Sequence, residues 1–284
     1  MTADRPTSAA APFAVRSEAR DVRNPKTGNV LRGTLYRPEG AAGPLPLALF
    51  AHEFGGHSRS PWWVRYATHL AAAGIAAYAF DFAGGGESCR SDGKTTDMSV
   101  LTEADDLESV LDAARGWTFA DPARILLCGG SQGGTVAAIV AARRAEAVAR
   151  LVLLYPAFVI RDDLHAKFAS PEAVPAVFRY NDWVDVGPRY VRDMWDFDVY
   201  EAMPSFARPV LIVHGDRDAI APLPYSERAA ATYPDARLAV LEADTHAFLL
   251  PETQERCLAA IDAFLRETAF HPAAPRGNPT KGPP

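Results

Sequence analysis

The sequence predicts an α/β fold, in which a mostly parallel sheet is flanked by helices on both faces. Short apolar runs alternate with helical stretches along most of the chain, which is the order of elements in a parallel sheet. Several of these runs are apolar at every position, as in Leu45–Ala51 (LPLALFA), which is typical of strands buried on both faces. The alternation stops over residues 157–206, and this predicts an inserted subdomain.

The elements can be predicted in chain order. Phe13–Val22 and Val30–Tyr36 are typical of an antiparallel pair, because VLRGTLY alternates apolar and polar residues. The stretch Leu101–Arg115 predicts an amphipathic helix with its apolar residues on one face. The other expected elements are strand Leu45–Ala51, helix Pro61–Ala73, strand Ile75–Phe80, strand Ile125–Cys128, helix Gln132–Ala147, strands Leu151–Tyr155, Pro209–His214 and Leu238–Glu242, and a closing helix Pro251–Phe264.

The chain has 284 residues, enough for one large domain with a full core. We expect an α/β core made of residues 13–156 and 207–270, interrupted by a cap or lid of residues 157–206. Residues 1–12 are expected to be a flexible N-terminus. Residues 271–284 are expected to be a disordered tail, since five of these 14 residues are proline.

The predicted cap, residues 157–206, is rich in aromatic side chains. Ten of its 50 residues are Phe, Trp or Tyr, against 10% of the whole chain. These side chains either pack among themselves or line a pocket for an acyl or aryl group, and composition favours neither. For the second case, the candidate substrate-binding residues are Trp183, Tyr190 and Trp195.

Charge and hydropathy exclude some classes of partner. Lys and Arg number 29 and Asp and Glu 35, which gives a net charge of −6, so a nucleic-acid partner is not expected. No stretch reaches the ~18 apolar residues of a membrane span, and the N-terminus has no apolar stretch typical of a secretory signal. We therefore expect a cytoplasmic protein. The acidic charge neither supports nor excludes a homodimer.

The cysteines do not predict a metal site or a disulfide framework. Cys89, Cys128 and Cys257 lie far apart and form no CxxC pair. A metal held by His52 and His57 with Asp81 or Glu87 has no ligand spacing to support it. We therefore expect neither a cofactor nor a metal.

The strongest signal for chemistry is the motif Gly129-x-Ser131-x-Gly133. It follows the predicted strand Ile125–Cys128 and precedes a predicted helix, which is the context of a nucleophile elbow. So tight a turn needs small residues at positions 129 and 133 and exposes the Ser131 hydroxyl at the end of the strand. The alternative is a glycine-rich helix start without chemistry, but strand, motif and helix together favour a nucleophile.

A serine nucleophile needs a base, and the base needs an orienting carboxylate. In a strand–elbow–helix fold these groups follow the serine in the order acid, then histidine. The loop HGDRDAIAP offers Asp216 and Asp218; we favour Asp218, because Asp216 directly follows Gly215 and suits a role in the turn. The loop EADTHAF supplies His246 as the base, the alternative being a solvated surface histidine.

Acyl transfer also needs two backbone N–H groups that bind the oxyanion. One is expected from Gln132, directly after the nucleophile. The other is expected from Phe54 in the loop HEFGGH, where Gly55 and Gly56 let the backbone approach a substrate. The alternative for this loop is an ordinary turn.

With these motifs the chain resembles the α/β-hydrolases, and more narrowly the bacterial cinnamoyl (feruloyl) esterases. The resemblance covers about residues 30 to 267. It rests on the segments HEFGGH (52–57), DFAGGGES (81–88), SDGKTTDMSVLTEADDLESVL (91–111), GGSQGG (129–134), HGDRDAIAP (214–222) and EADTHAF (242–248).

This resemblance implies Ser131 as nucleophile, His246 as base and Asp218 as acid, with Phe54 and Gln132 as oxyanion donors. It also implies that residues 157–206 form a small cap that contacts an aromatic acyl group. The chain departs from the family pattern at two positions. The loop before the phenylalanine usually reads His-Gly and here has Glu at position 53, and the residue before the serine is usually His and here is Gly.

The sequence therefore predicts a serine carboxylic-ester hydrolase that acts through an acyl-enzyme on a small-molecule ester, of cinnamoyl or other aryl or acyl type. Activity is expected to rise with pH as the His246 imidazole loses its proton. Peptide, thioester or lactone hydrolysis would use the same residues. A non-catalytic ligand-binding protein of this fold is the alternative from another class.

Overall fold

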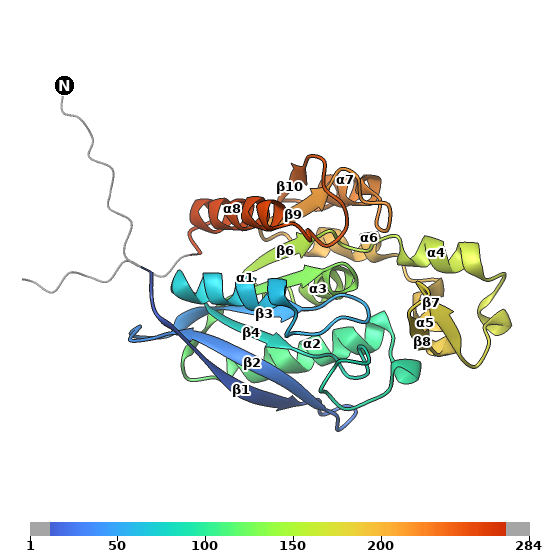
Figure 1. Cartoon of the computed structure of the whole chain (residues 1–284), viewed down its shortest axis with the longest axis horizontal. Helices are drawn as coiled ribbons and strands as arrows, with labels where there is room; N and C mark the ends of the chain where they lie inside the picture. The colour runs from blue at the N-terminus through green and yellow to red at the C-terminus, as the bar shows by residue number, and fades with distance from the viewer. Residues whose placement is uncertain (1–11, 271–284) are drawn as a thin grey trace, which may run out of the picture.

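The computed structural model describes residues 12–270. Eight strands form one sheet in the order β1-β2-β4-β3-β5-β6-β9-β10 (Figure 1). The pairs β1–β2 and β2–β4 are antiparallel, and all other neighbours in this sheet are parallel. The strands are β1 (Val15–Arg23), β2 (Val30–Pro38), β3 (Leu45–Ala51), β4 (Ala76–Phe80), β5 (Ala120–Gly130), β6 (Arg150–Leu154), β9 (Val210–Gly215) and β10 (Ala236–Leu241).

The sheet separates two apolar cores, because successive residues of a strand point to opposite faces. In β3, Leu47 and Leu49 belong to one core, and Ala48 and Phe50 belong to the other. The first core is covered by α2 (Val100–Arg115), α3 (Gln132–Arg143) and α7 (Leu223–Thr232). The second is covered by α1 (Pro61–Ala72) and α8 (Pro251–Glu267).

The segment between β6 and β9 forms a separate group of short elements. Figure 1 shows α4, α5, β7 and β8 gathered beyond the carboxyl ends of the central strands. Aromatic residues of this segment, among them Phe158, Tyr180 and Tyr190, are buried and join the core that α2 and α3 cover. The elements are α4 (Ile160–Lys167), β7 (Phe178–Tyr180), β8 (Val184–Val186), α5 (Pro188–Trp195), α6 (Val199–Ala202) and the single turns η2 (Pro171–Ala173) and η3 (Met203–Ser205).

The predicted fold class is confirmed, since the sheet is mostly parallel and has helices on both faces. The sequence shows no clear strand over residues 157–206, but the structure has two short ones there. Strands β7 and β8 pair antiparallel, and they are joined through Asn181 and Asp182, both at positive φ. Such a turn suits a tight hairpin, but strands of three residues are too short to show an apolar alternation.

Some predicted boundaries also differ. Strand β5 begins at Ala120 rather than Ile125. Its first half was not predicted, because it contains polar residues and is partly exposed. Helix α3 ends at Arg143 rather than Ala147. A turn follows the helix, and in this turn Ala147 N–H donates a hydrogen bond to Arg144 C=O. Helix α7 was not predicted, because its ten residues carry too little apolar pattern.

The predictions for the two ends of the chain, 1–12 and 271–284, fall outside the described residues, apart from residue 12. Among the helices of residues 12–270, none combines the length and the apolar character needed to cross a membrane.

Candidate active site

Ser131 lies in a strained turn between β5 and α3. Its φ is 51° and its ψ −121°, a conformation that L-residues rarely adopt. The turn is closed by glycines. A Cβ at Gly129 would lie 2.1 Å from the carbonyl oxygen of Gly133, and one at Gly133 would lie 2.2 Å from that of Ala51. The turn therefore needs glycine at both positions, a stricter requirement than the small residues expected from the sequence.

Three side chains predicted from separate loops meet at this turn. His246 Nε2 lies 2.9 Å from Ser131 Oγ, and His246 Nδ1 lies 2.6 Å from Asp218 Oδ2. Because an ionised carboxylate only accepts hydrogen bonds, Nδ1 carries the proton and Nε2 is free to accept one from the serine. The geometry suits proton transfer from Ser131 to His246.

Asp218 is held in place by several donors. Its Oδ1 accepts hydrogen bonds from the N–H groups of Ile220 and Ala221, each at 2.9 Å. The buried His214 places Nε2 3.2 Å from Oδ2. Burial disfavours the charge, but the hydrogen bonds from His214 and His246 outweigh it and hold the pKa of Asp218 well below its usual range.

The alternative acid, Asp216, is exposed to solvent, and its N–H donates to the carbonyl oxygen of Leu241. The structure thus places Asp218, and not Asp216, against the imidazole. His214 stands inside the motif HGDRDAIAP, but its support for Asp218 was not predicted. A histidine four residues before the acid is the signal in the sequence that could have found it.

The two residues predicted to supply oxyanion N–H groups, Phe54 and Gln132, line the same hollow as Ser131. Within residues 12–270, neither Phe54 N–H nor Gln132 N–H donates to a protein acceptor. Gln132 opens α3, where the first N–H groups of a helix lack intrahelical partners. Both groups are therefore free to bind an oxyanion near Ser131.

The side chain of Gln132 is fixed from two sides. Its Nε2 donates to Glu103 Oε2 at 2.8 Å, and its Oε1 accepts from Tyr190 OH at 2.6 Å. Burial raises the pKa of Glu103 well above its ordinary value, which favours the neutral acid. The hydrogen bonds that join Glu103, Gln132 and Tyr190 link α2, α3 and α5, and they fix the side chain in the first turn of α3.

A hollow opens beside Ser131 and is lined mainly by apolar and aromatic side chains. The lining includes Phe54, Ala157, Val159, Ile160, Tyr180 and Tyr190, with Asp163, Asn181 and Ile220 among its polar and outer members. Tyr180 OH lies 3.3 Å from Asp163 Oδ2. Of these residues the sequence singled out only Phe54 and Tyr190.

The two tryptophans predicted to bind substrate do not line this hollow. Trp183 is 61% exposed and lies close to Gly55. Trp195 packs against the His165 ring, with ring centroids 4.2 Å apart and planes tilted by 47°. Of the three candidates the structure places Tyr190 alone in the lining, because α5 turns that side chain toward α3.

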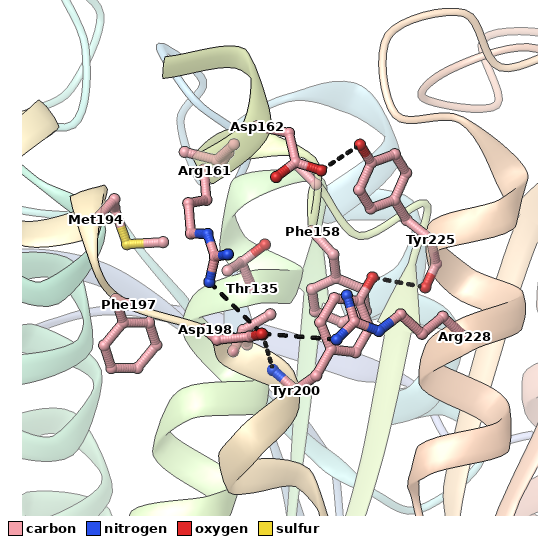
Figure 2. A pocket seen from close by; sticks show the side chains of 13 residues that line it. Thr135, Phe158, Arg161, Asp162, Met194, Phe197, Asp198, Tyr200, Tyr225 and Arg228 are labelled. Atoms are coloured by element: carbon pink, nitrogen blue, oxygen red, sulfur yellow. Dashed lines mark hydrogen bonds and ion pairs between the residues drawn. The ribbon is translucent and has the colours of Figure 1, made fainter. Parts of the chain in front are cut away.

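A second hollow shares Ala157 and Ile160 with the first, and Figure 2 shows the side chains that line it. Its charged side chains are paired with one another. Arg161 and Arg228 each approach Asp198 Oδ2 to 3.5 Å, and Tyr225 OH donates to Asp162 at 2.7 Å. These contacts join α4 and the N-cap of α6 to α7.

One cluster has the residue types of a metal site. His52, Asp81 and Cys89 bring a nitrogen, an oxygen and a sulfur within 4.8 Å of one another. The ligand atoms are already used, however. His52 Nε2 accepts from Phe82 N–H at 3.0 Å, and Asp81 accepts from Ser58 and Arg90. This pattern describes a hydrogen-bonded core cluster better than a cation site.

Two family models match the chain. One, described as serine aminopeptidase, S33, matches residues 44–183. The other, described as TAP-like protein, matches residues 193–274. No curated protein sequence matches the chain.

Solved structures are similar over most of the chain. Est1E from Butyrivibrio proteoclasticus with ferulic acid bound is 28% identical, with a TM-score of 0.81 over 88% of this chain and 99% of the other. A second Est1E structure is 25% identical, with a TM-score of 0.78 over 88% and 98%. Alpha/beta hydrolase domain-containing protein 10 from mouse is 19% identical, with a TM-score of 0.72 over 88% and 99%, a likeness of fold alone.

Proposed function

We propose that this chain, which belongs to the α/β-hydrolase superfamily, is a serine hydrolase that cleaves carboxylic esters. One observation carries the proposal. A hydroxyl on a strained turn, an imidazole and a carboxylate form a continuous hydrogen-bonded series at Ser131, His246 and Asp218. Side chains from three loops far apart in the sequence meet in the arrangement that activates a serine.

In the first half of the reaction Ser131 Oγ attacks the ester carbonyl carbon and passes its proton to His246 Nε2. Asp218 keeps the imidazole in the tautomer that accepts this proton and stabilises the cation that forms. His246 then gives the proton to the leaving alcohol as the ester bond breaks. An acyl group remains on Ser131.

In the second half a water molecule replaces the alcohol. His246 takes a proton from this water as the oxygen attacks the acyl carbon. The bond to Ser131 then breaks, and the serine oxygen recovers its proton from His246. In both halves the negative oxygen is bound by the N–H groups of Phe54 and Gln132, each worth about 3 kcal/mol by analogy with other such donors.

The hollow beside Ser131 favours an ester with an aromatic acyl group. Phe54, Tyr180 and Tyr190 present rings on its walls, with Phe54 and Tyr180 edge to face at 5.2 Å. Such surfaces suit a planar ring. The similar Est1E structure holds ferulic acid, an acid of this chemical type, which adds support for the substrate class.

We propose that residues 157–206 act as a cap over this hollow. The segment supplies most of the lining, including Ala157, Ile160, Tyr180 and Tyr190. Four of its elements, α4, α5, β7 and β8, lie beyond the carboxyl ends of the central strands (Figure 1), where ligands bind in open α/β sheets. The cap would therefore set the acyl preference, whereas the core would supply the chemistry.

Amide hydrolysis is the second candidate, and the family model described as serine aminopeptidase favours it. The same nucleophile and base would serve an amide or a peptide. The two candidates differ in the leaving group, which is an alcohol in one and an amine in the other.

The test is a substrate panel. We expect hydrolysis of p-nitrophenyl esters and methyl ferulate, with methyl ferulate preferred over methyl esters of short saturated acids. We expect far slower release from aminoacyl p-nitroanilides. Faster cleavage of the anilides would favour the peptidase, and preference for short saturated acyl groups would contradict the aromatic cap.

The panel needs a matched pair of variants. Ser131→Ala removes the nucleophile and should abolish turnover of every substrate cleaved by this site. Ser17→Ala alters an exposed serine on β1 and should leave all rates unchanged. Wild-type turnover by Ser131→Ala would contradict the proposed function.

A further inference from the structure

Glu53 places a carboxylate behind the nucleophile turn. Its Oε1 accepts hydrogen bonds from Trp62 Nε1 and Tyr155 OH, both at 2.9 Å, and its Oε2 accepts one from Trp63 Nε1 at 3.0 Å. All three partners are donors, which matches the ionised carboxylate. Three donors on one carboxylate fix its position more firmly than a solvated surface group would be fixed.

This carboxylate occupies the space that a side chain at position 130 would need. A Cβ on Gly130 would lie 3.2 Å from Glu53 Oε1 and 3.0 Å from Tyr155 OH. A side chain at position 130 would therefore be crowded by Glu53 together with its partners Trp63 and Tyr155. The two departures from the esterase pattern at positions 53 and 130 form one structural unit.

The same carboxylate reaches the predicted base through one side chain. Tyr155 is 1% exposed, and its ring meets the His246 ring edge on, with centroids 4.9 Å apart and planes at 65°. On another side Tyr155 packs against Phe248, again edge on. Burial first, and then the charge of Glu53, raises the pKa of Tyr155 well above its ordinary value, so its hydroxyl stays a donor to Glu53.

Glu53 also precedes Phe54, whose N–H is one of the proposed oxyanion donors. The carboxylate anchors its own residue to α1 through Trp62 and Trp63. Because both carboxylate oxygens of Glu53 accept hydrogen bonds, they restrain the Glu53 backbone and thereby the N–H of Phe54, the next residue. The contacts of Glu53 thus extend toward the base on one side and toward the oxyanion site on the other.

We propose that Glu53 is a positioning residue for the hydrolysis: its carboxylate holds Tyr155 against His246 and holds the Phe54 backbone beside Ser131. The proposal rests on the proposed function, since it assigns a role in that reaction. Glu53 acts through these neighbours and does not touch the substrate.

Other titratable groups surround this unit and must be considered in any pH experiment. His52, Tyr66 and Cys128 are buried close enough for the charge of Glu53 to act on them. Asp218 and Ser131 face His246 directly. A substitution at position 53 leaves all of these side chains in the protein, so a shift of the pH profile reports the removal of the Glu53 carboxylate.

The test is the variant Glu53→Gln, which keeps the size of the side chain but replaces one acceptor oxygen with an NH₂ donor. We expect kcat to fall about 10- to 100-fold, the scale of small misplacements near a reacting group, with KM changed less than about twofold because the substrate contacts remain. The midpoint of the pH–kcat/KM profile should move to lower pH, because removal of a nearby anion makes the imidazolium less favourable.

Two further variants separate positioning from simple folding. Tyr155→Phe removes the hydroxyl and keeps the ring. The fold-loss of kcat in the double variant with Glu53→Gln should be smaller than the product of the fold-losses in the two single variants. Glu53→Asp keeps the charge, and should leave the pH midpoint at the wild-type value while kcat is intermediate. Glu39→Gln, at an exposed glutamate, is the matched control.

Rates are expressed per active site titrated with a fluorophosphonate, so unfolded protein does not contribute. If Glu53→Gln melts at a lower temperature but keeps the wild-type kcat per active site and the wild-type pH midpoint, the residue is structural and the proposal is wrong. If the wild-type protein neither reacts with the probe nor hydrolyses esters, the proposed function fails as well, and the two failures are thereby told apart.

Discussion

Two hollows share a wall, since both include Ala157 and Ile160 in their linings. In the hollow of Figure 2 the charges are matched to one another, since Asp198 pairs with Arg161 and Arg228. In the hollow at Ser131 the backbone N–H groups of Phe54 and Gln132 have no protein acceptor within residues 12–270. Paired polar groups hold elements together, whereas preorganised groups with unused hydrogen-bonding capacity indicate chemistry.

The contrast extends to the backbone. The hollow at Ser131 contains a residue at positive φ, two N–H groups without a protein acceptor and a histidine oriented by a buried acid. The second hollow is walled by α4, α6 and α7 in ordinary helical geometry. Strain that the surrounding structure maintains is found more often at functional sites than at structural ones.

The largest expected effect comes from breaking the series at Ser131. His246→Ala should lower kcat by a factor on the order of 10⁵ to 10⁶, since it removes the base that contacts the serine. Asp218→Asn should lower kcat about 10⁴-fold, because it favours the wrong imidazole tautomer. Steady-state rates on a p-nitrophenyl ester measure both. Asp216→Asn is the matched control, and an equal loss in that variant would show that the acid is misassigned.

A smaller effect is expected from pH. Hydrogen bonds hold the pKa of Asp218 below its usual range, so this acid stays ionised from pH 7 down to pH 5. On acidification kcat/KM should therefore fall with the uptake of a single proton, which gives a tenfold fall per pH unit on the acid limb. A hundredfold fall per unit would mean that a second group, such as Asp218, titrates in this range.

The next effect compares one tyrosine in each hollow. Tyr190→Phe removes the hydrogen bond to Gln132 and leaves the buried Oε1 of Gln132 without this donor. We expect kcat/KM to fall about tenfold, which corresponds to a loss of about 1.4 kcal/mol in transition-state stabilisation. Tyr200→Phe removes a hydrogen bond to the Tyr225 carbonyl oxygen in the second hollow and should leave kcat/KM within about twofold. Denaturant unfolding should show a comparable loss of about 1 kcal/mol in both. Equal loss of activity in both variants would erase the distinction between the hollows.

The smallest effect is expected at the ion pair between Arg228 and Asp198. The Arg228 side chain is 59% exposed, and exposed ion pairs contribute about 0–1 kcal/mol. Arg228→Met should therefore lower the free energy of unfolding by at most about 1 kcal/mol and leave the rate on short esters unchanged. A large loss of activity would show that the second hollow takes part in the reaction.

The parts of the molecule that the sequence predicts well are those encoded by short contiguous patterns. The strand–Gly129-x-Ser131-x-Gly133–helix pattern is local, and chain order then leads to Asp218 and His246. The α/β class follows from the apolar strands such as β3, because burial on both faces leaves no polar position in the pattern.

Other features escape the sequence because they depend on residues brought together by folding. Glu53 looks like an added charge near the substrate, and its partners at positions 62, 63 and 155 cannot be paired with it before the fold is known. The predicted substrate residues Trp183 and Trp195 share an aromatic character with Tyr190, but the direction of each side chain depends on the β7–β8 hairpin and on α5. Composition gives no such direction.

The central claim is that Ser131 is an activated nucleophile. It is tested most directly by incubating the folded protein with a fluorophosphonate probe and locating the adduct by mass spectrometry. We expect one adduct per chain, on Ser131, with none in the Ser131→Ala or His246→Ala variants under the same conditions. A folded wild-type protein that stays unlabelled, or that carries the adduct on another residue, would contradict the claim.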